Sequence, residues 1–259
     1  MADLRFDKKK VYIADMAAVA PGTLLISNVR MKCVQLLDSR KGRLLCEVQL
    51  RDQPGKMCLT DRNTAAVCVG VDKIQIIQVK GKTLTLCGVV TVGKYVLGIT
   101  SSRNSLVVSY WKKPWLEKVS MDGKVLKQFD MRQNPEHFKF PHYICSTPDG
   151  SVFISDCSTQ MITQVDVSLN LLQTFTSPLL KYPRGITAVM EDQILVCNYS
   201  MENPHSILLL QPSTNTVTTL LGEEDEIECP YSLTYCPGEK KLFVKSGTIN
   251  KEIKVYQIA

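Results

Sequence analysis

One stretch of the chain, residues 141–178, decides the fold: it reads PHYICSTPDGSVFISDCSTQMITQVDVSLNLLQTFTSP. Four short runs rich in β-branched and aromatic residues occur in it, separated by turn residues such as Pro148-Asp149-Gly150. Runs of this kind predict strands, and the short turns between them predict antiparallel pairing. We therefore expect one four-stranded sheet, with strands at His142–Ser146, Ser151–Asp156, Met161–Val167 and Leu171–Thr176.

The opening of this stretch recurs along the whole chain, as Pro or a stand-in followed three positions later by an apolar residue. The steps between openings are 40, 42, 45, 42 and 47 residues. Because a small sheet must bury its faces against neighbours, six copies predict an all-β fold, a six-bladed β-propeller of four-stranded antiparallel blades. No linker divides the chain, so we expect a single domain, residues 1–259. The copies open at Ala14, Pro54, Val96, Pro141, Pro183 and Pro230.

The last copy supplies only three strands before the chain ends, at Ser232–Tyr235, Lys241–Lys245 and Glu252–Gln257. The missing outer strand is available at the other end of the sequence, in Leu4–Lys8. Pairing it with the last copy would remove an open sheet edge. We therefore expect the N-terminal strand to complete the last blade and close the ring.

The fourth copy carries a recognisable motif. Pro-x-x-Ile is followed by Asp149-Gly150, by a strand ending in Asp156 and by a second strand ending in Asp166. This pattern resembles the NHL repeat, in which Gly follows Pro-x; the fifth copy keeps that residue as Gly185, with Asn198 near the position of the Asp. The chain is similar to the C-terminal NHL propellers of tripartite-motif (TRIM) proteins.

The resemblance implies a scaffold that selects targets for ubiquitin transfer by a separate RING segment. No RING, B-box or coiled-coil segment is visible in this sequence. The motif residues themselves are expected to be structural, because Asp156 can accept hydrogen bonds from a neighbouring turn and Gly185 permits close packing of blades. The motif therefore identifies a fold rather than a function.

The composition favours an ordinary globular domain, with 44% apolar and 22% charged residues and a net charge of +6. The ten cysteines are scattered without zinc-binding spacing, and most stand in apolar runs, which predicts small buried residues in a reducing compartment. The sequence starts without an apolar leader, and no run approaches the ~20 apolar residues that span a bilayer. We expect a cytoplasmic, monomeric domain without membrane contact, cofactor or metal.

Blade connectivity divides the loops between two rims. The loops from the last strand of one blade to the first of the next, and from the second strand to the third, share one rim, which we call the upper rim. Cations alternate with aromatic residues there. We take these as candidate partner-binding residues: Tyr110, Trp111, Lys112, Lys113, Trp115, His137, Lys139, Lys181, Tyr182, Arg184 and Tyr199.

The partner class stays open at this point. Aromatic planes beside cations suit single-stranded or structured RNA, since bases stack and phosphates meet the cations. The same residue types are protein hot spots, so a protein or peptide fits equally well. The acidic segment Glu223–Glu226, with Glu228, lies on the same rim and would repel phosphate. A merely solvated face with packed aromatic residues is a third possibility.

Catalysis finds little support in the sequence. The three histidines, His137, His142 and His205, stand outside any hydrolase or zinc-protease motif. A calcium-dependent propeller hydrolase is the alternative function. It would need carboxylates where the first strands open, and we identify Pro, Val, Tyr and Gly at those positions. We therefore expect a non-catalytic recognition scaffold.

Overall fold

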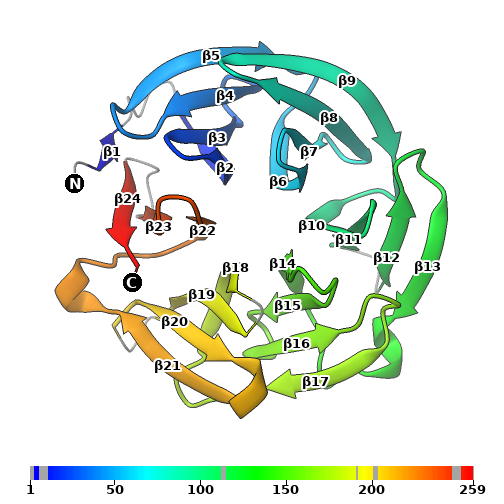
Figure 1. Cartoon of the computed structure of the whole chain (residues 1–259). Helices are drawn as coiled ribbons and strands as arrows, with labels where there is room; N and C mark the ends of the chain where they lie inside the picture. The colour runs from blue at the N-terminus through cyan, green and yellow to red at the C-terminus, as the bar shows by residue number, and fades with distance from the viewer. Residues whose placement is uncertain are drawn as a thin grey trace.

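The computed structural model describes residues 3–5, 11–111, 115–190, 192–200, 204–246 and 252–258. In this part of the chain, twenty-four strands form six separate four-stranded sheets arranged as a ring (Figure 1). Every recorded strand pairing is between antiparallel neighbours, such as β14 with β15 and β15 with β16. The predicted six-bladed β-propeller is confirmed.

Each blade contributes four strands, a to d, from the ring axis outwards (Figure 1). Blades 1 and 2 are β2 (Ile13–Ala20), β3 (Thr23–Asn28), β4 (Cys33–Asp38), β5 (Arg43–Gln49), and β6 (Pro54–Asp61), β7 (Thr64–Val69), β8 (Lys73–Lys80), β9 (Thr83–Thr91). Blades 3 and 4 are β10 (Val96–Ser102), β11 (Ser105–Tyr110), β12 (Trp115–Ser120), β13 (Val125–Asp130), and β14 (Pro141–Ser146), β15 (Val152–Asp156), β16 (Met161–Val165), β17 (Leu171–Phe175). Blades 5 and 6 are β18 (Tyr182–Met190), β19 (Gln193–Tyr199), β20 (Ser206–Gln211), β21 (Thr216–Leu221), and β22 (Ser232–Cys236), β23 (Lys241–Ser246), β24 (Glu252–Gln257), β1 (Leu4–Arg5). Short 3-10 helices lie at η1 (Met131–Gln133), η2 (Pro212–Thr214) and η3 (Glu223–Asp225).

The hydrophobic core lies between neighbouring blades. All five residues of β15 are buried, because this strand is covered by sheets on both sides, whereas β13 at the circumference is largely exposed. Phe153 and Phe175 stack with ring centroids 6.1 Å apart, and their cluster continues into the inner strands of blade 5. Burial between blades thus explains why the β-branched runs repeat with a constant period.

The two ends of the described chain meet in blade 6 (Figure 1). Strand β1 pairs with β24, with Leu4 opposite Ile253 and Arg5 opposite Glu252. Leu4 is buried in the cluster that also contains Ile253. The predicted closure is confirmed for Leu4–Arg5; residues 6–8 of the expected strand lie outside the described residues.

The polar residue at the end of strand b has the structural role expected for it. Buried Asp156 accepts hydrogen bonds from the backbone N–H groups of Lys139 (2.6 Å) and Phe140 in the preceding loop, and from Ser158 (2.9 Å). In blade 5, Asn198 accepts one from the N–H of Lys181 at 3.0 Å. These bonds fix the upper-rim loops onto the blades.

The expected opening of the first copy is wrong by one residue. Ile13, not Ala14, pairs with Asn28 at the end of strand b, as Pro141 pairs with Asp156 in blade 4. No proline marks this opening, so the sequence pattern lacked its anchor there. The shift brings Asp15 to the position that Tyr143 occupies in blade 4.

The expectation that the cysteines are buried is met in part. Five of the ten cysteines are buried, and Cys87 is exposed. In the part of the chain that the structure describes, no helix has both the length and the apolar character that crossing a membrane requires.

Candidate functional site

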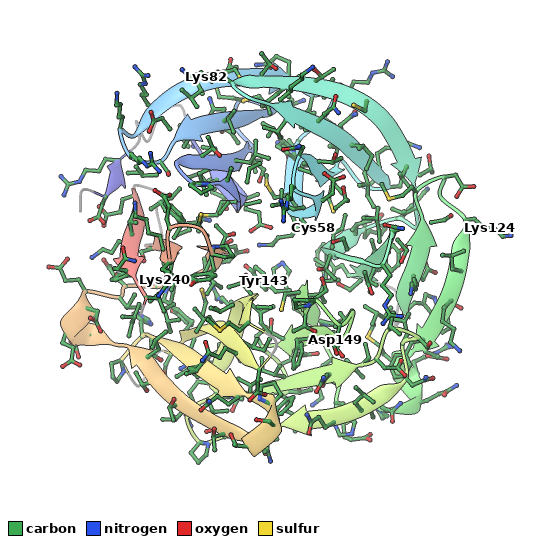
Figure 2. All side chains as sticks on the ribbon, viewed as in Figure 1. Cys58, Lys82, Lys124, Tyr143, Asp149 and Lys240 are labelled. Carbon is green, nitrogen blue, oxygen red and sulfur yellow. The ribbon has the colours of Figure 1, made fainter. Side chains whose placement is uncertain are left out.

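The inner strands of the six blades surround a central channel, which contains a cavity of about 360 Å³. Figure 2 shows Tyr143 pointing towards this centre, while Lys82 and Lys124 lie at the circumference. Six residues near the start of the inner strands form what we call the channel mouth, at the upper rim. They occupy the position where the repeat has Gly: Asp15, Lys56, Gly98, Tyr143, Gly185 and Ser232.

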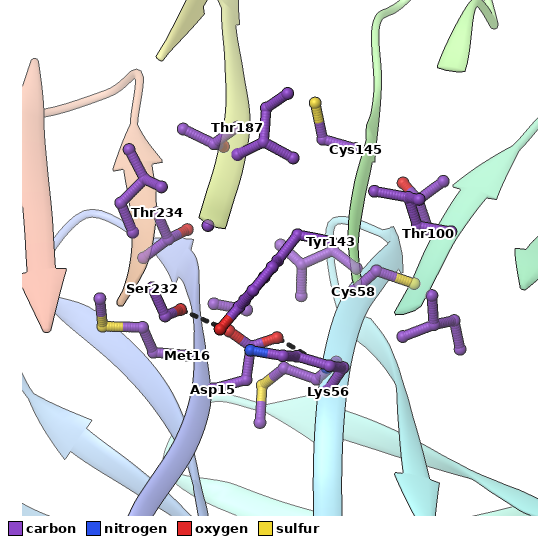
Figure 3. Close-up of a pocket in the computed structure, with 18 of the residues that line it drawn as sticks. Asp15, Met16, Lys56, Cys58, Thr100, Tyr143, Cys145, Thr187, Ser232 and Thr234 are labelled. Atoms are coloured by element: carbon purple, nitrogen blue, oxygen red, sulfur yellow. Dashed lines mark hydrogen bonds between the residues drawn. The ribbon is translucent and has the colours of Figure 1, made fainter. Parts of the chain in front are cut away.

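Polar contacts hold the charged side chains of the mouth in place (Figure 3). The Asp15 carboxylate accepts hydrogen bonds from the Ser232 hydroxyl (2.5 Å) and from the Met57 N–H (3.0 Å). The Lys56 ammonium donates to the Ala14 carbonyl (3.3 Å) and lies 3.7 Å from the centroid of the Tyr143 ring, a cation–π contact. Burial lowers the pKa of Lys56, and the nearby Asp15 opposes this shift.

Tyr231, Lys245 and Arg184 lie beside these six residues, and we count them as part of the channel mouth because basic side chains gather around the Tyr231 ring. Lys245 Nζ lies 4.3 Å from its centroid, Lys56 Nζ 4.9 Å, and the Arg184 guanidinium carbon 5.3 Å. Burial, followed by repulsion from Lys56, lowers the pKa of Lys245 to about 7. Burial also lowers the pKa of His142 to about 3, so this imidazole is neutral at pH 7. Three cations therefore face one aromatic ring.

Of the predicted contact residues, Tyr182, Arg184 and Tyr199 come together. The Arg184 guanidinium carbon lies 4.6 Å from the Tyr199 ring centroid, and Tyr199 is 6.2 Å from the Tyr182 ring. Tyr199 also stacks on His205 with centroids 5.1 Å apart. Tyr182 is 42% exposed. We call Tyr182, Arg184 and Tyr199 the rim patch; Arg184 joins it to the channel mouth through Tyr231.

Tyr110 requires a correction, because it is only 1% exposed and cannot contact a partner. It ends strand b of blade 3 and so occupies the position of Asp156 in blade 4. Its hydroxyl donates to the Glu117 carboxylate (2.5 Å) and accepts from the Gly93 N–H (3.3 Å) of the preceding loop. Tyr110 therefore anchors a loop instead of binding a partner.

The two tryptophans of blade 3 separate. Trp111 is 58% exposed on the upper rim, where its backbone N–H donates to the Tyr95 carbonyl at 2.9 Å. Trp115 packs partly into the core, and the Arg132 guanidinium covers its ring at 4.5 Å. Arg132 is already paired with Asp130 (2.7 Å). Lys112 and Lys113 lie outside the described residues.

The remaining predicted residues lie along the rim without forming one cluster. His137 is half-buried, with Nδ1 3.2 Å from the Thr174 hydroxyl and Nε2 3.4 Å from the Glu136 carboxylate. Lys139 is exposed and Lys181 half-buried, and the backbone of each is tied to the end of a strand b.

Sequence reasoning missed Asp15, Lys56, Tyr231 and Lys245, although a signal for Lys245 existed. The residue that precedes the loop-anchoring position of strand b faces the next blade, and in blade 4 this residue, Ser155, donates to the Arg184 carbonyl at 2.6 Å. Blade 6 places Lys245 at this position, opposite Ser232. The equivalent residues of the other blades are all small: Ser27, Cys68, Ser109, Ser155 and Cys197.

The statement that strand openings lack carboxylates is wrong for Asp15. The donor set nevertheless disfavours calcium, because Lys56 and Lys245 surround this carboxylate with positive charge. Among the described residues, no three His, Cys, Asp or Glu side chains cluster as metal ligands. Burial raises the pKa of the Cys68 thiol to about 12, which makes it a poor nucleophile.

No protein-family model matches the chain, and no curated protein matches its sequence. Solved structures with similar folds include a protein of unknown function from Bacteroides thetaiotaomicron VPI-5482, at a TM-score of 0.76 and 16% identity over 99% of this chain and 72% of that one. Virginiamycin B lyase from Staphylococcus aureus matches at a TM-score of 0.67 and 15% identity, over 99% of this chain and 88% of that one. The Cps50 (Swd1) β-propeller domain from Myceliophteria thermophila matches at a TM-score of 0.64 and 12% identity, over 95% of this chain and 84% of that one. Likeness at these identities shows the propeller fold alone.

Proposed function

We propose that the protein is a non-catalytic recognition scaffold that binds a partner protein through the upper rim. The rim patch carries this proposal: Arg184 is held between the rings of Tyr199 and Tyr231, and exposed Tyr182 lies beside them. A cation whose position is already fixed by aromatic rings loses little side-chain entropy on binding. Tyr and Arg are also the residue types that contribute most to protein interfaces.

The charge distribution favours a protein over RNA. The acidic helix η3 and Glu226 lie on the same rim, and the Glu226 carboxylate is exposed although it accepts a hydrogen bond from Lys254 (2.8 Å). A nucleic acid that follows a rim must place many phosphates beside it, and these carboxylates would repel them. A folded partner or a peptide can contact the rim patch while leaving the acidic segment in solvent.

The resemblance to TRIM-NHL propellers supports a more specific version of the proposal. In that version the propeller selects targets for ubiquitin transfer, and a separate RING segment performs the transfer. The likeness to virginiamycin B lyase rests on 15% identity and supports the propeller fold alone, so it does not enter this proposal.

The test is capture of partners from nuclease-treated extract on the immobilised domain. We expect Tyr182→Ala to remove a defined set of proteins and to weaken binding of the purified partner at least tenfold, or about 1.4 kcal/mol. Lys82→Ala, at an exposed lower-rim turn, is the matched control and should retain them. Identical capture by all three proteins would contradict the proposal. Tight binding of single-stranded RNA with a steep salt dependence would replace the protein partner by RNA.

A further inference from the structure

The channel mouth carries more positive than negative charge among the described residues. Lys56, Lys245 and Arg184 surround the Tyr231 ring, and Asp15 is the carboxylate within reach of both lysines. The lysines are 8% and 4% exposed. Burying charge without a matching counter-charge costs free energy, so this arrangement is not explained by folding.

Lys245 shows the imbalance most directly. Its ammonium faces the rings of Tyr231 (4.3 Å) and Tyr12 (5.6 Å), and among the described residues it meets no hydrogen-bond acceptor. In blades 1, 3 and 4 the equivalent serine hydroxyl donates to a neighbouring carbonyl instead, as in the 2.9 Å bond from Ser109 to Pro141. The chain thus departs from its repeat to bring a cation to the mouth.

A second buried polar group at the same place is incompletely satisfied. The Tyr143 hydroxyl is inaccessible to solvent and makes no hydrogen bond of standard geometry to a described residue, although burial and then the nearby Tyr231 hydroxyl raise its pKa. Its ring crosses the mouth beside Asp15 and Lys56 (Figure 3). Unpaired buried polar groups are rare in folded proteins, and each calls for an explanation such as a ligand.

We propose that the channel mouth binds the phosphate monoester of a ligand. At pH 7 the pKa of Lys245, about 7, leaves this side chain about half protonated, so Lys56, Lys245 and Arg184 against one carboxylate give an excess of between one and two positive charges. A phosphate monoester carries about 1.5 to 2 negative charges at pH 7 and would favour the charged form of Lys245. A single carboxylate would neutralise only part of this excess. The Lys56 and Lys245 ammonium groups, the Arg184 guanidinium and the Tyr143 hydroxyl are all donors suited to phosphate oxygens.

The inference deepens the proposed function and rests on it in one respect, since Arg184 belongs to both the mouth and the rim patch. Arg184 is half-buried and contacts the rings of both Tyr199 and Tyr231, so a phosphate on a flexible side chain of a protein bound at the rim patch would meet this cation first. A free small phosphomonoester has the same chemistry.

The first experiment titrates inorganic phosphate at constant ionic strength and measures the melting temperature Tm. We expect a saturable rise in Tm for the wild type, because a ligand that binds only the folded state stabilises it. Lys245→Met should weaken the apparent affinity at least tenfold. Lys82→Met, at the exposed lower rim, should show the same rise in Tm as the wild type. This control accounts for the general stabilising effect of phosphate on proteins. Equal responses of all three proteins would overturn the proposal.

Asp15→Asn should change the phosphate affinity in the opposite direction. Phosphorus NMR measures binding to this variant, so that the result does not depend on Tm. Removing the carboxylate beside the cations removes its repulsion, so phosphate should bind several-fold more tightly. Unchanged or weaker binding would overturn the site. Phosphorus NMR is measured well below the melting temperature, so the loss of stability expected for Asp15→Asn does not obscure the result.

Two further arms identify the source of the phosphate. A phosphoserine peptide that binds more tightly than free phosphoserine, and loses that advantage in Tyr182→Ala, assigns the group to a partner protein. Equal affinities assign it to a free small molecule; either result supports the site. Tighter binding of a 5′-phosphorylated oligoribonucleotide than of the peptide would overturn the protein partner. If phosphate fails while Tyr182→Ala still abolishes capture, only the inference about the mouth is lost.

Discussion

The two ends of the central channel differ in charge, although serine hydroxyl groups connect neighbouring blades at both ends. At the lower end, Ser101 donates to the Leu59 carbonyl (2.7 Å) and Ser146 to the Ser101 carbonyl (2.5 Å), so hydroxyl groups connect neighbouring blades. At the upper end, Lys56 and Lys245 gather around aromatic rings with one carboxylate between them. Satisfied polar groups hold a ring together, whereas uncompensated charges indicate a binding site.

The largest expected effect tests the single carboxylate of the upper end. Asp15→Asn should lower the free energy of unfolding by about 3 kcal/mol, because removing one member of a buried charge cluster leaves the others uncompensated. Urea unfolding measures this change. A loss no larger than that of a lower-end serine would show that the two ends are energetically alike.

The next effect has the opposite sign. Lys245→Met should raise the free energy of unfolding at pH 7 by about 1–3 kcal/mol, since it replaces a buried, unpaired charge with an apolar side chain of similar length. Destabilisation by this variant would instead mean that the lysine has a structural counter-charge.

The stability gained by Lys245→Met should depend on pH, because it depends on the protonation of Lys245. The pKa of Lys245 is about 7 in the folded protein, and that of an unfolded lysine is about 10.4. Between these values the unfolded state binds more protons, so wild-type stability rises with pH. The advantage of Lys245→Met should therefore be largest at pH 7 and below. It should shrink by up to about 1.4 kcal/mol per pH unit between pH 7 and 8.5.

The smallest effect belongs to the lower end. Ser101→Ala should lower the free energy of unfolding by about 1 kcal/mol, the usual contribution of one hydrogen bond, and should leave the phosphate response unchanged. Urea unfolding and the phosphate titration check both expectations. A change in phosphate binding would mean that the anion occupies the whole channel rather than its upper end.

The ring was predictable because its signal is periodic. Strand runs and turns recur every 40–47 residues, and the incomplete last copy called for a strand from the other end of the chain. The sorting of loops onto the upper rim was also correct where Trp111 bonds to Tyr95 and Asp156 to Lys139, since each bond joins the two kinds of loop. Such features depend on local patterns, which the sequence displays directly.

The channel mouth was not predictable in the same way. Asp15, Lys56, Tyr143, Tyr231 and Lys245 come from four different blades, and only the closed ring brings them together. Searching for adjacent cations and aromatic residues instead selected the run from Tyr110 to Trp115.

In the run from Tyr110 to Trp115, closeness in sequence did not predict a shared surface. Tyr110 belongs to a buried strand and Trp111 to the loop after it, so two neighbours in sequence have opposite exposure. Among the described candidates, Tyr182, Arg184 and Tyr199 met in space because they lie at adjoining ends of paired strands; Tyr182 lies opposite Tyr199 in the β18–β19 register.

The pairing of Leu4 with Ile253 has a consequence for how the molecule is made. Because β1 and β24 share one sheet, a ribosome must synthesise and release the segment up to β24 before the ring can close. Until then blade 6 exposes an unpaired edge, which is open to the same edge of another nascent copy. Assembly should therefore be slow compared with helical proteins of this length, and most vulnerable to misassociation in its final step.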